Sequence, residues 1–306
     1  MFRILALCSI LLIAVPNAFA WGEAGHLMSN EAATLTLPND MPSFFYRAFP
    51  QLVWFGPQPD RLLHTGGPSF DAEDAPDHFL NYEMVEGLEL TPDRYQYLAA
   101  LISSGRYAHL GVSLSTPGFS PWRIAEMSDR LTGLFREWRA SAPRSAERLA
   151  IEHDIVVTAG SLGHFVADSA NPLHDTTDYN GWLRANPNGY ANDCLIHARF
   201  ESDFVARAVN VADIVPKVAA PVLRSDYFNA ALDFIKRSNT LVERVYQLDK
   251  KGDFDEIARP SAEGKEFAAD RLAAGASLLR DLWWSAWKNS ETTLQRRRGP
   301  ASATTK

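Results

Sequence analysis

Residues 146–174 read AERLAIEHDIVVTAGSLGHFVADSANPLH, and this stretch decides the fold class. From residue 146 to 169 apolar side chains recur at helical spacing, which predicts a long and largely buried helix. The pair Asn171-Pro172 predicts its end. Similar periodicity occurs in four further segments: residues 122–139, 200–211, 227–248 and 262–287. Because no run alternates apolar and polar residues as a strand does, the sequence predicts an all-α fold.

The N-terminal part of the chain is less regular. Residues 26–35 predict a short helix, whereas residues 55–78 are rich in Pro, Gly and Asp and predict a long loop. Residues 178–193 predict a second long loop. Loops of this length in a compact domain are usually functional or disordered.

Residues 1–20 have the features of a secretory signal peptide. Arg3 precedes an apolar run over residues 4–15, and the segment ends in Ala18-Phe19-Ala20. A membrane anchor is the alternative, but the run is too short to cross a hydrocarbon core about 30 Å thick. We therefore expect cleavage after Ala20, export to the periplasm or out of the cell, and Trp21 as the first residue of the mature chain.

The rest of the chain is expected to form one domain. No internal repeat or linker divides residues 21–295, and residues 296–306 predict a disordered basic tail. Cys8 leaves with the leader, so Cys194 has no internal disulfide partner. A lone cysteine is more often a small buried residue than a nucleophile, and we expect Cys194 to be buried.

Composition and charge are those of a soluble globular protein. The 306 residues are 46% hydrophobic and 22% charged, with a net charge of −7. This balance does not indicate specific binding to duplex DNA. Nucleases stay possible, because metal ions can supply the positive charge that a phosphate needs. No later segment is apolar over about 18 residues, so we expect no transmembrane segment. The sequence gives no indication of the oligomeric state.

Histidines and carboxylates occur at helical spacing in two predicted helices. His164 and Asp168 are four residues apart, as are His197 and Glu201, so each pair shares one helical face. His174 follows the first pair just beyond Pro172. Imidazole and carboxylate on one rigid face suit a divalent metal. The alternative is a hydrogen-bonded core pair and a solvated surface pair.

Several motifs, taken together, resemble a known family. They are Trp21-Gly-Glu-Ala-Gly-His26, Pro59-Asp60, Asp77-His78-Phe79, GHFVADSANPLH over residues 163–174 and IHARFE over residues 196–201. The chain from Trp21 to about residue 290 is similar to the zinc-dependent superfamily of fungal and plant single-strand-specific nucleases and bacterial phospholipases C. The resemblance implies a single-domain, multi-helix fold with long loops at a metal site.

The resemblance also implies a site with three zinc ions. The free amine and carbonyl of Trp21 would bind the first ion together with His26. Asp168 would bridge this ion to a second. The second ion would also be held by Asp60, His78 and His164, and the third by His174, His197 and Glu201.

The implied chemistry is hydrolysis of a phosphate ester. Zinc lowers the pKa of bound water to about 7 and so provides a hydroxide at neutral pH. Asp60 would lie beside the attacking water as a ligand or as an orienting base. Arg61 would contact phosphate, with an exposed salt bridge as the equal alternative. The α-amine of Trp21 titrates near pH 7.7–8.0 in model peptides, which favours metal binding, and it exists only after the leader is removed.

The substrate is less well determined than the chemistry. Glu201 as the last ligand resembles the phospholipases, whereas the short step from Trp21 to His26 resembles the nucleases. Ala24 and Arg61 stand where choline-specific phospholipases carry an acid and an aromatic residue. Phe79 would stack on a nucleobase or belong to the core, and Trp182 and Tyr190 are candidates for a wall of the substrate site. We favour a nuclease acting on single-stranded nucleic acid, with a phospholipase C as the alternative.

Phosphomonoesters such as 3′-nucleotides are further candidate substrates. A non-catalytic zinc-binding surface module and a purely helical exported scaffold are the remaining hypotheses.

Overall fold

The computed structural model describes residues 21–63, 65–105, 113–255 and 261–292. The predictions for the leader, residues 1–20, and for the tail, residues 296–306, lie outside these residues. Within them the chain is helical and contains no β-strand, and one isolated antiparallel bridge joins Leu80 and Gly118. The all-α prediction is confirmed.

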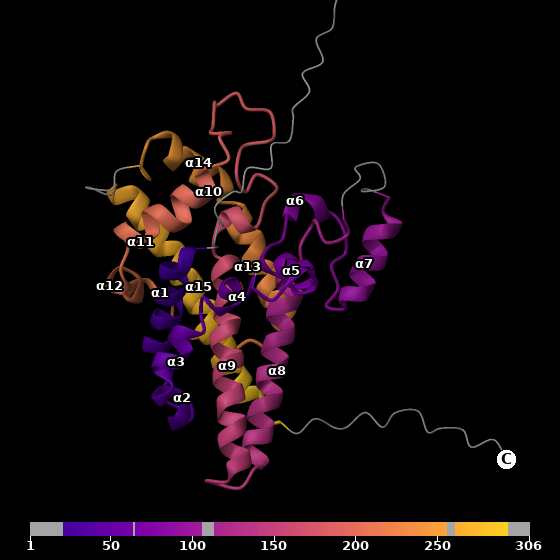
Figure 1. Ribbon diagram of the computed structural model, residues 1–306, viewed down its shortest axis with the longest axis vertical. Coiled ribbons are helices and arrows are strands. Elements are labelled where there is room, and N and C mark those ends of the chain that lie inside the picture. The colour runs from indigo at the N-terminus through magenta and orange to yellow at the C-terminus, as the bar shows by residue number, and fades with distance from the viewer. Residues whose placement is uncertain (1–20, 64, 106–112, 256–260, 293–306) are drawn as a thin grey trace, which may run out of the picture.

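The chain contains both long and short helices (Figure 1). In order they are α1 (Gly22–Leu35), α2 (Ser43–Arg47), α3 (Phe49–Trp54), α4 (Gln58–Leu62), α5 (Pro68–Asp74), η1 (Ala75–His78), α6 (Tyr82–Val85), α7 (Arg94–Ser103), α8 (Ser120–Ala140), α9 (Ala146–Asp168), η2 (Pro172–His174), α10 (Ile196–Ala198), η3 (Arg199–Phe204), α11 (Val205–Ala208), α12 (Val211–Ile214), η4 (Val215–Lys217), α13 (Tyr227–Asn239), α14 (Val242–Lys250) and α15 (Ala262–Asn289).

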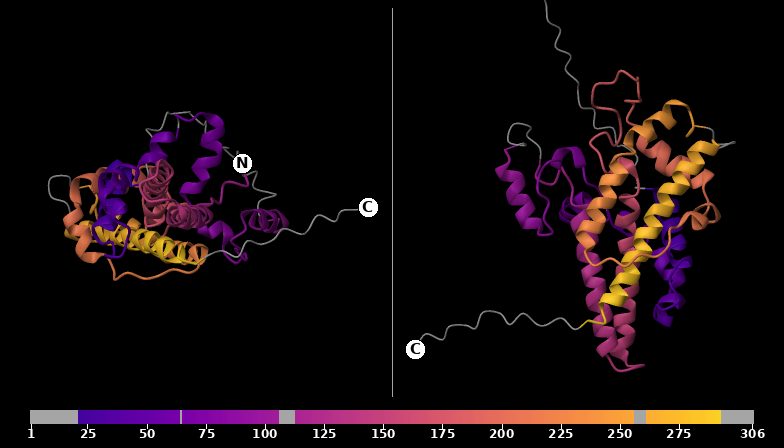
Figure 2. Two further views of the ribbon diagram at one scale, coloured as in Figure 1. Left: turned by 90° about the horizontal axis from the view of Figure 1, so that it is seen from below. Right: turned by 180° about the vertical axis from the view of Figure 1, so that it is seen from behind.

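Helix α9 is the central element of the fold. The Ser145 hydroxyl accepts a hydrogen bond from the Arg148 amide and caps its start. Towards its C-terminus nearly every residue is buried, because α1, α3, α8 and α15 all pack against it. Figure 1 shows α8 and α9 running side by side, and Figure 2 shows α15 crossing them. Side chains near the C-terminal end of α9 are therefore enclosed by several elements.

The prediction of a long loop over residues 55–78 was wrong. The structure forms α4, α5 and η1 there. Each of these helices has a proline in its first turn, namely Pro59, Pro68 and Pro76. Proline is tolerated in a first turn because the amide hydrogen that it lacks has no helical partner there. The prolines that indicated a loop thus begin short helices.

Two predicted helices are interrupted. Residues 227–248 form α13 and α14, which are separated at Thr240, whose hydroxyl donates to the Arg237 carbonyl. Residues 200–211 lie in the π-helix η3, in α11 and at the start of α12. A π-helical turn often marks a functional site, and η3 contains Glu201. Helix α7 and the helices α2 and α3 were not predicted.

Residues 178–193 form no helix, as predicted for the second loop. Cys194, just beyond it, is exposed, so the prediction that it is buried was wrong. Its backbone has φ of 59°, a turn conformation at the surface. No helix within the described residues is long and apolar enough to cross a membrane.

Candidate metal centre

Three groups of histidine and carboxylate side chains lie buried on α1, α4, η1, α9, η2, α10 and η3. Within each group one candidate ligand atom per residue lies within 4.8 Å of the others. The groups are His26, His164 and Asp168; Asp60, His78 and His164; and His174, His197 and Glu201. The eight side chains that the resemblance implies as zinc ligands therefore converge in space.

The first group forms between α1 and α9. His26 Nε2 lies 3.4 Å from Asp168 Oδ1, and the rings of His26 and His164 stack with centroids 3.9 Å apart. The two helices approach closely at Gly163, where an added Cβ would lie 2.0 Å from Asn30 Oδ1. Glycine at this position therefore allows the two histidines to meet.

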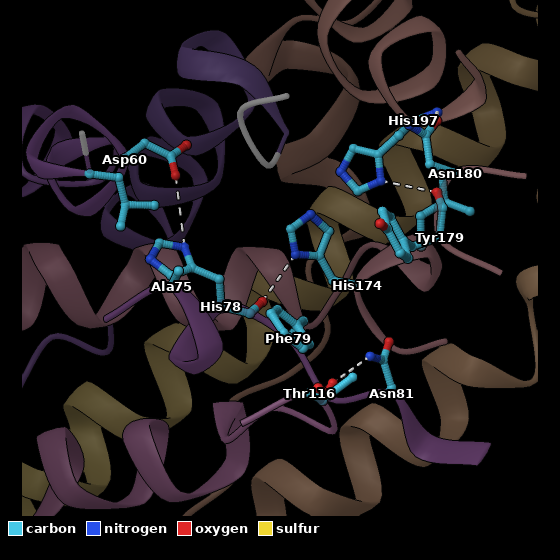
Figure 3. Close-up of a pocket in the computed structure, with 12 residues that line it drawn as sticks. Asp60, Ala75, His78, Phe79, Asn81, Thr116, His174, Tyr179, Asn180 and His197 are labelled. Carbon is cyan, nitrogen blue, oxygen red and sulfur yellow. Dashed lines mark hydrogen bonds and ion pairs between the residues drawn. The ribbon is translucent and has the colours of Figure 1, made fainter. Parts of the chain in front are cut away.

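The second group adds residues from α4 and η1 to the end of α9. His164 Nε2 lies 3.3 Å from Asp60 Oδ1, and His78 Nδ1 lies 3.7 Å from the same oxygen. Figure 3 shows His78 pointing towards Asp60. Helices α4 and η1, which lie where a loop was predicted, thus contribute two of the three residues of the second group, Asp60 and His78.

Asp168 lies between the first two groups. Its Oδ1 faces His26, whereas its Oδ2 lies 3.2 Å from His78 Nδ1 and 3.4 Å from His164 Nε2. One carboxylate with its two oxygens directed at different groups has the geometry of a bridge between two cations. This is the position that the resemblance assigns to Asp168.

The third group lies on η2, α10 and η3. His197 Nε2 and His174 Nε2 lie 3.0 Å and 3.4 Å from Glu201 Oε2. Asn171 Nδ2 donates to the same oxygen at 2.9 Å, and Glu201 is fully buried. The surface alternative for His197 and Glu201 does not hold, because both side chains are buried.

Trp21 is fully buried beside these groups. Its indole Nε1 donates to the Ala167 carbonyl at 2.6 Å, and its ring packs against Phe200. Its backbone nitrogen donates to Glu201 Oε2 at 3.2 Å, and its carbonyl accepts from the Gly25 amide. The main chain of Trp21 thus lies among the candidate ligands, whereas its role as a ligand stays a prediction.

The donor set fits metal ions. His164, His174 and His197 each donate Nδ1–H to a backbone carbonyl at 3.0 Å, which leaves Nε2 of each ring as a lone-pair donor. Several buried atoms have no hydrogen-bond partner among the described residues, namely His26 Nε2, Asp60 Oδ2, Asp168 Oδ1 and Glu201 Oε1. Unpartnered buried polar atoms are costly, and cations at these groups would satisfy them.

Charges within the centre shift its pKa values in opposite directions. Burial, together with the nearby His164, lowers the pKa of His26 to about 4. For His78, hydrogen bonds to Asp168 and Asp74 outweigh the effect of burial and raise the pKa to about 10. For Asp168, the histidines outweigh burial and lower its pKa well below the usual range. Without metal, Asp168 thus stays charged and favours a proton on His78, a place that a bound cation would take.

The sequence analysis missed Asp74, which forms a hydrogen bond with the His78 nitrogen that faces away from Asp60 and Asp168. His78 Nε2–H donates to Asp74 Oδ2 at 3.3 Å, so its Nδ1 is left to face Asp60 and Asp168. Asp74 in turn accepts from Arg123 at 2.7 Å. The four-residue spacing of Asp74 and His78 was a visible signal, but the interpretation of the segment as a loop concealed it.

A cavity of about 400 Å³ opens beside the second and third groups. Its lining includes the candidate ligands Asp60, His78, His174 and His197, together with Leu63, Ala75, Phe79, Asn81, Thr116, Leu173, Tyr179 and Asn180 (Figure 3). The Asn81 side chain is held by the Thr116 carbonyl, to which it donates at 2.7 Å. The cavity therefore combines metal-ligand chemistry with an aromatic and apolar wall.

Phe79 lines this cavity, as its predicted substrate contact requires. Trp182 and Tyr190 do not line it: both are buried and pack against Tyr246, so they form no wall of this cavity. Tyr179, which is 52% exposed, lines the cavity from the same loop.

Arg61 lies outside the cavity lining. It pairs with Glu23 at 3.2 Å, donates to the Trp54 carbonyl and stacks over the Trp54 ring. These are the contacts of the salt-bridge alternative, and a phosphate contact of Arg61 stays a prediction.

Comparisons with known proteins found two similar solved structures. No family model matches the chain, and no curated protein matches it. The alpha-toxin from Clostridium absonum matches with 11% identity and a TM-score of 0.42, over 92% of this chain and 67% of the toxin. Alpha-toxin from an avian strain of Clostridium perfringens matches with 14% identity and a TM-score of 0.37, over 90% and 66%. The chain thus spans about two thirds of the length of each toxin.

Fold and site together define the class of protein. It is an all-α protein with three buried groups of candidate histidine and carboxylate ligands, two of which share His164, and two of the three groups contribute to the lining of one cavity. The groups consist of the side chains that the resemblance to the zinc-dependent superfamily implies as ligands.

Proposed function

We propose that the protein is a zinc-dependent hydrolase of phosphate esters, with phosphodiesters as its main substrates. The observation that carries the proposal is the position of Asp168, whose two oxygens face two different groups of buried ligands next to the cavity. Clustered cations suit phosphoryl chemistry because they can clamp both the attacking and the leaving oxygen of an in-line displacement.

Zinc is the metal that this donor set favours. Imidazole nitrogens predominate, with carboxylate oxygens completing each group. When bound, zinc would supply Lewis acidity, and it would lower the pKa of water to near neutrality. His26, His164 and Asp168 would hold one ion with the main chain of Trp21. Asp60, His78, His164 and Asp168 would hold a second, and His174, His197 and Glu201 a third.

Asp60 has a role beyond ligation in this proposal. Its carboxylate is buried yet lines the cavity, and its Oδ2 has no hydrogen-bond partner among the described residues. An acceptor at the boundary between ligands and cavity can orient the attacking water and accept its proton. We therefore assign Asp60 to positioning the nucleophile.

Removal of the metal tests the reaction class. A chelator should abolish hydrolysis of a generic phosphodiester such as bis(p-nitrophenyl) phosphate, and added zinc should restore it. Chelator already saturated with zinc is the control, since it leaves the enzyme loaded. Undiminished hydrolysis by protein shown to be metal-free would rule out the proposal.

Two substrate classes remain for the proposed enzyme. The Trp21–His26 spacing, together with the ring of Phe79 on the cavity wall, supports single-stranded nucleic acid, because bases stack on aromatic side chains. Glu201 supports a phospholipase C. Neither matching structure is described as a nuclease, so what the comparisons found lies nearer to the phospholipase C alternative. We therefore propose both substrates on equal terms.

A substrate panel separates the two classes. The zinc-loaded protein is assayed on single-stranded DNA, on RNA and on phosphatidylcholine vesicles. A nuclease should lose affinity for nucleic acid in Phe79→Ala, with KM raised about tenfold because one stacked base contributes about 1–3 kcal/mol. Phe70→Ala, which lies outside the cavity lining, is the control. Cleavage of lipid without cleavage of nucleic acid assigns the phospholipase C and removes the nuclease.

We also propose that the enzyme is exported through a cleaved signal peptide. The leader features of residues 1–20 support this, together with the buried position of the Trp21 nitrogen beside Glu201. Sequencing of the N-terminus of protein recovered from outside the cytoplasm should read Trp-Gly-Glu-Ala. A mature chain that still begins at Met1 would refute it.

A further inference from the structure

A second cavity, of about 490 Å³, lies between α13 and α15. Residues 218–226 pass over α15, as Figure 2 shows from behind. Amides of this segment donate to Ser277, Asp281 and Ser285. These three residues are four apart and so share one face of α15. No residue that lines this α13–α15 pocket lines the cavity at the metal centre.

Positive charge predominates in the lining of the α13–α15 pocket. Four basic side chains line it, with one acidic side chain: Lys217, Arg224, Arg237, Arg271 and Asp270. The whole chain has the opposite balance, with 37 acidic and 30 basic residues. A local excess of cations in an acidic protein marks a surface that attracts anions.

Two of the four cations are already neutralised. Lys217 pairs with Glu266 and with Asp270, the latter at 2.9 Å. Arg224 pairs at 2.9 Å with the buried Asp281, which also holds Arg280. The two pairs therefore involve Asp270, which lines the pocket, and Asp281, which does not.

Arg237 and Arg271 are the other two cations, and neither forms an ion pair among the described residues. Arg271 Nε is buried without a hydrogen-bond partner, and burial lowers the pKa of its guanidinium. The Ser238 hydroxyl, 1% exposed, belongs to the same lining and interacts with the carboxyl of Asp175, which lies outside the lining. Buried donors without acceptors are uncommon in folded proteins, so Arg271 Nε indicates a missing ligand with acceptor oxygens.

The remaining wall of the pocket is apolar. Phe234, Leu241 and Leu278 contribute to it, all three from α13, α15 or the turn after α13. The volume is many times that of a water molecule, which occupies about 30 Å³ in the liquid. A ligand that matches both the basic and the apolar part of the lining therefore has an anionic group and a compact apolar group.

We propose that the α13–α15 pocket binds an organic phosphate monoester, with its phosphoryl group on Arg237 and Arg271 and its organic group against Phe234 and Leu278. Arginine suits such a head group because its planar fork of donors matches phosphate oxygens in a bidentate manner. This site is separate from the proposed hydrolytic centre, and it does not depend on bound zinc.

Equilibrium dialysis of phenyl phosphate against the zinc-loaded protein tests the proposal. We expect two binding events, of which one persists after zinc is removed. Arg237→Gln should weaken the zinc-independent event about tenfold or more, as expected for the loss of charge-assisted hydrogen bonds. Arg271→Gln should act in the same direction, and Arg237 is exposed, so its replacement should leave the fold intact. Arg130→Gln, an exposed site on α8, is the matched control.

Neutral benzyl alcohol should bind at least about tenfold more weakly than phenyl phosphate, because it lacks the anionic head. Two results would overturn the proposal. One is the absence of any zinc-independent binding in the wild type. The other is zinc-independent binding that stays within twofold of wild type in both Arg237→Gln and Arg271→Gln. The zinc-independent binding is measured without zinc. Its absence would therefore not bear on the proposed hydrolase activity, and an absence of hydrolase activity would not bear on the proposed binding to the α13–α15 pocket.

Discussion

At the scale of single residues, Asp168 is the side chain that connects the candidate metal sites, because its two oxygens face His26 in one group and His78 in another. Asp168→Asn should lower the number of zinc ions per chain and reduce phosphodiesterase activity by at least about 10³-fold, the scale of losing a preorganised electrostatic group. Metal analysis and kcat/KM measure the two effects. Asp154→Asn, exposed on the same helix, should change neither. Activity above a tenth of wild type in Asp168→Asn would be incompatible with a bridging role.

Asp74 acts through His78, and its loss should be milder. Asp74→Asn weakens the acceptor for His78 Nε2–H, so the orientation and basicity of the ring suffer. Zinc affinity should fall about 10–100-fold, with kcat largely recovered at saturating zinc. Glu73→Gln, the exposed neighbour, is the control. If excess zinc fails to restore activity, Asp74 is required for folding and not for metal binding.

In the proposed enzyme, Trp21 would link zinc binding to processing of the chain. Its nitrogen is buried beside Glu201, and a free α-amine is easier to deprotonate than lysine. A protein with one additional glycine before Trp21 should bind one zinc ion fewer than a protein that begins at Trp21. Native mass spectrometry counts the ions. Equal zinc content in the two forms would exclude the amine as a ligand.

The clustering of the candidate ligands was predictable in part from the sequence, because the spacing within a motif is local information. The pairs His164–Asp168 and His197–Glu201 share a helical turn in any helix. Which oxygen of Asp168 faces which histidine was not predictable, because it depends on how α1, α4 and η1 pack on α9. The same holds for Arg61, whose pairing with Glu23 depends on the approach of α4 to α1.

At the scale of elements, the contact between α1 and α9 positions His26 against His164. Gly163→Ala would place a Cβ against Asn30, whose Nδ2 donates to the carbonyls of Leu52 and Gly160. Displacing Asn30 breaks two buried hydrogen bonds, which should lower the free energy of unfolding by about 1–3 kcal/mol. Denaturant unfolding with and without zinc measures this.

Gly133→Ala on α8 is the matched control for this substitution. An added Cβ there has open space around it, so the better helix propensity of alanine should raise the free energy of unfolding by up to about 1 kcal/mol. If both alanine variants change stability in the same direction, close packing at Gly163 is not the cause.

Long helices were easier to predict than short ones. The periodicity of α8, α9 and α15 spans many turns, whereas α4 and α5 offer too few residues for a repeat. The many prolines and glycines of residues 55–78 are typical of a loop, but three of these prolines lie in the first turns of helices. The break between α13 and α14 was also missed, because the apolar spacing continues across it.

At the scale of the whole molecule, bound zinc should contribute to stability, since the ligands come from segments far apart in the sequence. Free zinc at about 100 times Kd adds about 2.7 kcal/mol for one site. With about 2–4 °C per kcal/mol, the loss of even one of the three ions should lower Tm by about 5–10 °C, so chelation should lower Tm by at least this much. Scanning calorimetry with chelator, and with zinc-saturated chelator as the control, measures it. An unchanged Tm would show that the groups are satisfied without metal.

The central claim is that three zinc ions occupy these three groups, and anomalous X-ray scattering at the zinc edge tests it most directly. Crystals of the mature protein should give one peak at His26 and Asp168, a second at Asp60, His78 and His164, and a third at His174, His197 and Glu201. No anomalous peak at any of the three groups, in protein grown and purified with zinc, would contradict the account.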